Sequence, residues 1–191
     1  SASNKEMADK ALRVLCAAMR TYSKQPSNEP DELEQDLCYI GLTGMIDPVR
    51  PEVVDAIKEC KSAGIRPIMI TGDHKDTAVA IAKQLGIIGA NQKAVTGMEL
   101  NSMSDEELDE HIEEYSVYAR VQPEHKVRIV QAWKKRGKIT AMTGDGVNDV
   151  LALKDADCSV AMASGSDAAA QASQLVLLDS NFACMPSVVM E

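Results

Sequence analysis

Aromatic side chains are almost missing from this sequence, which holds one Phe, one Trp and four Tyr among 191 residues. Surfaces that bind nucleic acid often stack bases on such rings, and no cluster of Lys and Arg compensates, because the formal net charge is −9. Nucleic acid and anionic membrane surfaces are therefore poor partners for it. With ten Met and a hydrophobic fraction of 45%, we expect an aliphatic core.

The sequence also lacks pairs of cysteines that are spaced like metal ligands. The cysteines are odd in number, widely spaced and without a C-x-x-C pair: Cys16, Cys38, Cys60, Cys158 and Cys184. This usage is typical of reduced, buried cysteines in a cytosolic compartment. No apolar run approaches the roughly 18 residues that span a bilayer, and no signal peptide opens the chain. Because the sequence starts and stops within helix-like patterns, we expect a piece of a larger protein.

What the sequence does contain is an alternation of strand-like and helix-like segments. Strands are predicted over 37–46, 66–70, 116–121, 138–142, 158–163 and 175–178. Helices are predicted over 5–20, from Pro51 towards Gly64, up to Gly86, and over 123–135, 147–154 and 167–172. This order favours the α/β class, with a Rossmann-like parallel sheet covered by helices on both faces. Residues 88–115 are the least regular and are interpreted as an insertion or a peripheral hairpin.

Residues 143–149, T-G-D-G-V-N-D, concentrate carboxylates and glycines directly after a predicted strand. The two glycines let the backbone bend sharply and approach an anion. Asp145 is the first carboxylate after the strand and a suitable ligand for Mg²⁺. Asn148 and Asp149 follow one helical turn later, where they can hold the metal's water shell or orient Asp145. A lone Asp-Gly is usually only a turn, but this density of polar residues and glycines favours a metal held against a phosphate.

A second turn of the same kind, Thr71-Gly72-Asp73, follows another apolar run. It offers a hydroxyl and backbone N–H groups at a helix amino end, where the helix dipole favours phosphate. The simpler alternative is a helix capped by Thr71 or Asp73. Because the carboxyl ends of parallel strands share one edge of a sheet, we expect both turns at that edge.

A phosphoryl-transfer site also needs a fixed cation, and Lys126 at the start of the 123–135 helix can supply it. The alternative is an ordinary solvated lysine. Of the three histidines, His125 and His111 are interpreted as surface residues, and His74 beside Asp73 is assigned no role.

Taken together, these motifs resemble those of the haloacid dehalogenase superfamily, and more narrowly the phosphorylation domain of P-type cation-transporting ATPases. Residues 44–51 are similar to that family's G-M-x-D-P-x-R segment, and residues 69–74 and 119–126 match its successive segments. Residues 140–149 resemble its T-A-M-T-G-D-G-V-N-D signature. The resemblance covers residues 5–191 and is closest to calcium-pump-like members.

The resemblance implies a role for each motif residue. Asp145 would ligate Mg²⁺, Lys126 would pair with the phosphoryl charge, and Asn148 and Asp149 would complete the catalytic site. The residues that would contact the transferred phosphate or the nucleotide are Thr71, Gly72, Asp73, Lys126 and Asn148, with Arg120 and Arg13 as nucleotide-contacting arginines.

The resemblance also implies an organisation. Residues 1–25 would be the tail of a nucleotide-binding domain, 26–36 a linker, and 37–191 a partial phosphorylation domain. The parent would be a membrane protein with this segment on its cytoplasmic side, using Mg²⁺ and ATP to form an aspartyl phosphate. Its partners would be ATP, a transported cation, of the calcium type, and the rest of the pump chain, including membrane helices that this sequence lacks.

Three departures from the family pattern matter. The phosphorylated aspartate of the family lies in D-K-T-G-T, which this sequence lacks, so we expect the chain by itself to be inactive. Asp155-Ala156-Asp157 resembles the superfamily's first D-x-D motif but precedes its predicted strand, which argues against a nucleophile there. Residues 150–153 read V-L-A-L where the family usually has A-P-A-L, and 161–166 read A-M-A-S-G-S in place of A-M-G-x-G-T. These changes weaken any assignment of the transported ion.

Two other functions are compatible with the motifs. One is a free-standing phosphatase of the same superfamily, for which Asp47 is the only candidate nucleophile, although Pro48 and Arg50 break the motif. The other is a non-catalytic regulatory module that keeps the fold without the reaction.

Overall fold

The computed structural model describes residues 6–7, 12–45, 48–179 and 181–185. The contacts within it divide the chain into two units, residues 1–48 and 49–191, which are described separately. Asp47, the candidate nucleophile of a phosphatase, lies outside the described residues.

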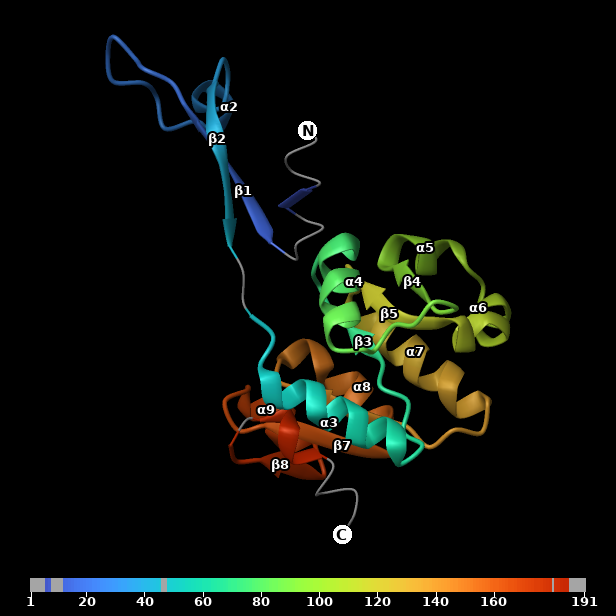
Figure 1. Cartoon of the computed structure of the whole chain (residues 1–191). Helices are drawn as coiled ribbons and strands as arrows, with labels where there is room; N and C mark the ends of the chain where they lie inside the picture. The colour runs from blue at the N-terminus through green and yellow to red at the C-terminus, as the bar shows by residue number, and fades with distance from the viewer. Residues whose placement is uncertain (1–5, 8–11, 46–47, 180, 186–191) are drawn as a thin grey trace. The chain divides into compact units, whose positions relative to one another are not determined.

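The first unit is built on an antiparallel pair of strands, β1 (Arg13–Met19) and β2 (Cys38–Met45), with the short helix α2 (Pro30–Leu33) between them (Figure 1). The pairing runs from Arg13 opposite Met45 to Met19 opposite Cys38, with an irregularity at Ala17/Ala18. The helix predicted over 5–20 is therefore wrong for residues 13–19. Their apolar residues fit a helical stripe equally well, but pairing with the distant β2 segment determines the backbone.

The second unit contains parallel strands in two sheets of three. One sheet has the order β3 (Met69–Ile70), β5 (Tyr115–Ala119), β4 (Lys93–Thr96). The other has the order β6 (Ala141–Gly144), β7 (Cys158–Met162), β8 (Leu175–Leu177). All pairings in both sheets are parallel. The predicted α/β class with a parallel sheet and flanking helices is confirmed, but the sheet is in two parts, with β3 and β6 as edge strands.

Helices surround these sheets. They are α3 (Pro51–Ser62), α4 (Lys75–Gln84), α5 (Gly97–Ser102), α6 (Asp105–His111), α7 (Pro123–Lys135), α8 (Val150–Asp155) and α9 (Asp167–Ala172). Short 3₁₀ turns lie at η1 (Ile112–Glu114), η2 (Val147–Asp149) and η3 (Phe182–Cys184). As predicted, Gly64 follows the end of α3, and its φ of +80° is a conformation that glycine adopts without strain. No helix within the described ranges is both long and apolar enough to cross a bilayer.

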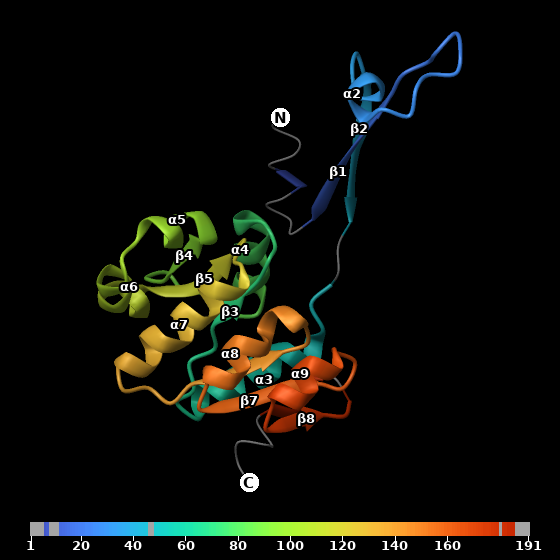
Figure 2. The same cartoon turned by 180° about the vertical axis from the view of Figure 1, so that it is seen from behind.

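The core follows the alternation of side chains along the central strands. On β5, Val117 and Ala119 pack with α3 and α4, whereas Tyr118 packs on the opposite face with α5, α6 and α7. Helix α7 joins the two sheets, because its Ile129 belongs to the Tyr118 cluster and its Val130 packs against Met142 and α8. Figure 2 shows α7 between β5 and α8 from the opposite side.

Residues 88–115 differ from the expectation of an irregular insertion. They contain β4, α5 and α6, and they contribute Val95, Leu100 and Leu108 to the core, each 1% exposed. Capping boxes begin α5 at Thr96 and α6 at Ser104. Strand β6 is shorter than predicted and starts at Ala141, with Ile139 at 89% exposure.

Candidate functional site

The 143–149 turn leaves the carboxyl end of β6 and folds back on itself through Asp149. This carboxylate is buried, with 5% exposure, and its Oδ2 accepts hydrogen bonds from the backbone N–H groups of Asp145 (3.3 Å) and Gly146 (3.2 Å). Gly144 is required for this closure, because a Cβ there would lie 2.6 Å from the Asp149 Cβ. The Asp145 side chain is left on the exposed side of the turn.

Lys126 closes the turn from α7. Its Nζ donates to Asp149 Oδ1 at 2.6 Å, and the two side chains are only 17% and 7% exposed. Such a pair is weakly screened by water, and each charge depends on its partner to offset the loss of hydration. Asp149 therefore connects the cation on α7 to the backbone that carries Asp145.

The loop after β7 holds the backbone of Asp145 from the other side. The Ser166 N–H donates to the Asp145 carbonyl at 2.7 Å. A Cβ on Gly165 would lie 2.5 Å from that carbonyl oxygen and 2.9 Å from the Asp145 Cα, so only glycine fits. Neither residue was assigned a role from the sequence, although a glycine at a strand is a signal for the close approach of another backbone.

The Thr71-Gly72-Asp73 turn follows β3 and is stabilised internally. The Thr71 hydroxyl accepts from the Asp73 N–H at 3.1 Å and donates to the Asp73 Oδ2 at 3.2 Å. Neither residue caps α4, because the N-cap is His74, whose ring nitrogen Nδ1 accepts from the Asp76 N–H at 3.5 Å. The alternative in which Thr71 or Asp73 caps the helix is therefore excluded.

Residues 120–126, which we name the α7 corner, tie this second turn to α7. The Arg120 N–H donates to the Asp73 carbonyl at 3.1 Å, and the Val121 N–H donates to the Thr71 carbonyl at 3.3 Å. Arg120 has φ of +52°, a left-handed conformation that is uncommon for a non-glycine residue. The α7 corner thus contacts the Thr71-Gly72-Asp73 turn through its backbone and the 143–149 turn through Lys126.

The structure accordingly brings most of the predicted residues into one chain of contacts. Lys126, Asp145 and Asp149 meet through the 143–149 turn, and Thr71, Asp73 and Arg120 meet through the α7 corner. Asn148 is exposed on η2, and Gly72 has open space where a Cβ would stand. Arg13 belongs to the first unit, where it begins β1.

The donor chemistry of the site suits a small, hard cation. Within the described ranges no group of three or more His, Cys, Asp or Glu side chains could hold a metal. Mg²⁺ does not require such a cage, because it is usually bound by one or two carboxylates together with phosphate and water. Asp145 is the carboxylate available for that, since Asp149 is committed to Lys126 and to the turn.

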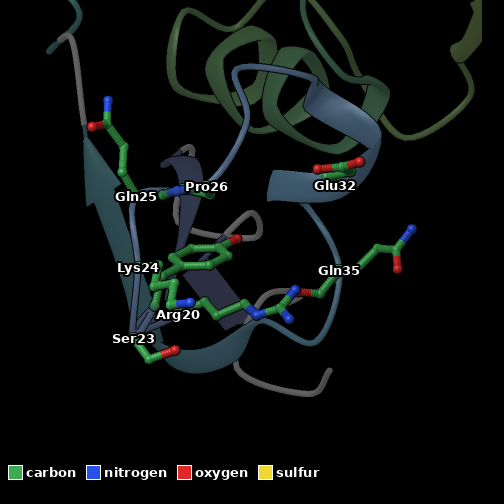
Figure 3. A pocket seen from close by; sticks show the side chains of 8 residues that line it. Arg20, Ser23, Lys24, Gln25, Pro26, Glu32 and Gln35 are labelled. Atoms are coloured by element: carbon green, nitrogen blue, oxygen red, sulfur yellow. The ribbon is translucent and has the colours of Figure 1, made fainter.

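A hollow in the first unit lies apart from these residues in the sequence. It is lined by Arg20, Tyr22, Ser23, Lys24, Gln25, Pro26, Glu32 and Gln35. Arg20 lies 4.8 Å from the centre of the Tyr22 ring. It donates to the Gln35 carbonyl at 2.8 Å, and Figure 3 labels both of these residues. Arg20 is therefore already hydrogen-bonded within the first unit. None of the predicted site residues lines the hollow.

His125 is the main residue that the sequence analysis placed incorrectly. It was predicted to lie at the surface, but it is 2% exposed and hydrogen-bonded through both ring nitrogens. Its spacing from Ile129 and Ala132 on the buried face of α7 is the helical signal that would have found it. His111 is exposed as predicted and pairs with Glu114 at 2.8 Å.

Comparison with known proteins agrees with the motifs. Residues 7–157 match the model of the haloacid dehalogenase-like hydrolase family. The chain is 51% identical over 189 residues to a calcium-transporting ATPase of Listeria monocytogenes and 48% identical over 188 residues to one of Bacillus subtilis. Over 183 residues it is 46% identical to human potassium-transporting ATPase alpha chain 2.

These alignments cover 97%, 98% and 82% of the chain, but only 21%, 21% and 18% of the respective relatives. The chain therefore spans about a fifth of the length of the relatives it matches, and the resemblance to P-type cation-transporting ATPases is confirmed over that part. Because both glycine-acid turns follow parallel strands and the family match covers most of the sequence, the chain belongs to the haloacid dehalogenase-like hydrolases.

Proposed function

We propose that this chain is the phosphorylation-domain part of a P-type cation pump that works through an aspartyl phosphate and uses Mg²⁺ and ATP. In the parent it would lie on the cytoplasmic side of the membrane, and residues 1–25 would belong to the nucleotide-binding domain. The bacterial relatives are calcium-transporting by name, which supports a calcium pump. The human potassium-transporting relative is nearly as similar, so this segment alone favours the pump class more strongly than the ion.

The observation that carries the proposal is the Lys126–Asp149 pair closed onto the backbone of Asp145 and Gly146. Asp149 holds the turn so that Asp145 is presented at the carboxyl end of β6. Lys126 places a positive charge beside the same turn, where it would face the equatorial oxygens of a transferring phosphoryl group. When bound at Asp145, Mg²⁺ would supply further neutralisation of that charge.

The second turn would bind the phosphate from the other side. Gly72 leaves space for close approach, and the Thr71 hydroxyl, which bonds Asp73 here, lies at the carboxyl end of β3, where it would turn to the phosphate. Asn148 would complete the shell from η2, and Arg120 and Arg13 would contact the nucleotide.

The phosphate-accepting aspartate would come from a segment outside this sequence. D-K-T-G-T does not occur in the chain, and Asp157 precedes β7, at the end of the strands opposite the turns. The Asp157 carboxylate instead accepts hydrogen bonds from Thr140. Strands β3 and β6 are both edge strands, so a strand ending in the missing aspartate would find pairing partners next to each turn.

Two measurements test this proposal. Titration of Mn²⁺, a paramagnetic substitute for Mg²⁺, should give binding that Asp145→Asn abolishes and that the control Asp55→Asn, on α3, leaves unchanged. Incubation with labelled ATP and Mg²⁺ should leave this chain unlabelled, whereas a chain extended to include D-K-T-G-T should form an acid-stable, hydroxylamine-sensitive phosphate. Mn²⁺ affinity that does not depend on Asp145, or an acyl phosphate on the present chain, would contradict the proposal.

A further inference from the structure

His125 lies on the first turn of α7 and is buried against α5, beside the site but without a role in the chemistry proposed above. Its Nδ1 accepts from the backbone N–H of Gln122 at 2.9 Å, and its Nε2 lies 2.7 Å from the Asn101 Oδ1. A backbone N–H can only donate, so Nδ1 carries no proton. Nε2 must therefore carry the proton and donate to the Asn101 oxygen, which fixes a neutral ring in one tautomer.

The surrounding backbone is shaped to this ring. A Cβ on Gly97 would lie 2.9 Å from the His125 Cε1 and 3.0 Å from its Nδ1, and it would also overlap the Arg120 carbonyl. Only glycine at 97 therefore permits the ring and the left-handed Arg120 to pack against α5. Asn101, the partner of Nε2, is itself an exposed residue of α5.

We propose that His125 is a positioning residue of the phosphate site. The hydrogen bond to Asn101 anchors the first turn of α7 to α5, and the hydrogen bond from Gln122 closes the amino end of α7. The next residue, Lys126, then extends to Asp149 from a fixed starting point. This inference rests on the proposed function only for the phosphate that Lys126 would bind. The anchoring of α7 by His125 does not depend on that function.

The tautomer is tested directly by long-range ¹H–¹⁵N correlation of the histidine rings at pH 7. The expected result for His125 is a proton on Nε2 and none on Nδ1, while His111 serves as the exposed reference. A proton on Nδ1, or a ring protonated on both nitrogens, would overturn the proposal without any variant being needed.

The effect on Lys126 is tested by the rate at which its amine is acylated, followed by mass spectrometry of peptides. Asn101→Leu removes the acceptor of Nε2, whereas Asn101→Asp, at the same exposed position, keeps an acceptor oxygen. Asn101→Leu should raise the Lys126 rate by about threefold or more, the effect of one lost hydrogen bond, and Asn101→Asp should restore the original rate. Lys58, exposed on α3, provides the internal reference.

A role limited to stability would lower the melting temperature of Asn101→Leu without changing the Lys126 rate in the folded protein, and that result would refute positioning. The assay contains neither metal nor phosphate. Absence of Mn²⁺ binding would therefore count against the proposed function alone, and an unchanged acylation rate against His125 alone.

Discussion

At the scale of single residues, Asp149 is the centre of the site. It is buried and yet charged, and its two carboxylate oxygens are divided between Lys126 and the backbone of the turn. Through its hydrogen bonds to the turn backbone, this carboxylate fixes the position of Asp145 and leaves the Asp145 side chain exposed. Gly144 and Gly165 are also required for this arrangement, because a Cβ at either position would collide with the turn.

Replacing Lys126 by Met should lower the free energy of unfolding by about 3–5 kcal/mol, because Asp149 would stay buried without its cation. Urea denaturation measures this change. The matched control is Lys58→Met, which breaks an ion pair with Asp55 whose side chains are 70% and 76% exposed, and should cost less than about 0.5 kcal/mol. Equal costs for both substitutions would contradict the assigned burial of the Lys126 pair.

Gly165→Ala should displace the backbone of Asp145, since the added Cβ meets backbone atoms that cannot move cheaply. We expect Mn²⁺ affinity to fall about tenfold, the size of effect known for residues that orient a ligand. Gly89→Ala, where a new Cβ would have only the flexible Gln92 side chain nearby, at 3.7 Å, should leave the affinity unchanged. Calorimetric titration of both variants would decide the matter.

At the scale of elements, helix α7 and the junction between β6 and β7 position the site. Helix α7 packs against both sheets and carries Lys126 at its start. At the junction, Asp157 precedes β7 and accepts from the backbone N–H of Thr140 at 2.8 Å, just before β6. This contact fixes the start of β6 against β7, and thereby helps to position the 143–149 turn at the other end of β6.

The hydrogen bonds at this junction make stability depend on pH. The Thr140 backbone N–H, with help from its hydroxyl and from Lys134, holds the pKa of Asp157 below its ordinary value of 3.8. Because the folded pKa is the lower one, the contribution is fully present above pH 3.8 and is lost as the pH falls through the folded value. The stability difference between the wild type and Asp157→Asn should therefore be largest near pH 6 and shrink below pH 3.8. Urea denaturation at several pH values measures it, and a difference that grows on acidification would contradict the assignment.

At the scale of the whole molecule, the two units differ in how much they bury. Among the residues that the structure describes, the buried hydrophobic clusters all belong to residues 49–191. In the first unit the described residues of β1 and β2 are exposed or half-buried, including Leu15 at 54% and Ile40 at 60%. A two-stranded ribbon of this kind has little independent stability.

Hydrogen exchange should therefore separate the two units. Backbone amides of β1 and β2 should exchange faster than those of β5 by about two orders of magnitude or more, because opening the ribbon exposes almost no buried apolar surface. Amide exchange followed by NMR measures the difference. Equal protection of the ribbon and β5 would show that the ribbon is stabilised by contacts beyond those between its own strands.

Much of the second unit follows from sequence patterns. The helices that begin at Pro51 and Pro123 and the glycine-acid turns after β3 and β6 all depend on residues close together in the chain, so their positions were predicted correctly. The failures have a different physical origin. Residues 13–19 form a strand because of a partner some 25 residues away, and residues 88–115 are regular because β4 pairs with β5.

The sequence by itself determined the family and the two glycine-acid turns, and it singled out Lys126 and Asp145 as candidate site residues, because these are local motifs with fixed spacing. Only the tertiary structure decided that Asp149 rather than Asp145 pairs with Lys126, that Ser166 and Gly165 hold the Asp145 backbone, and that His125 is buried. Each of these depends on groups brought together from different elements, where burial and the need to pair every buried polar atom select the partner. Local patterns carry no information about which distant group satisfies that need.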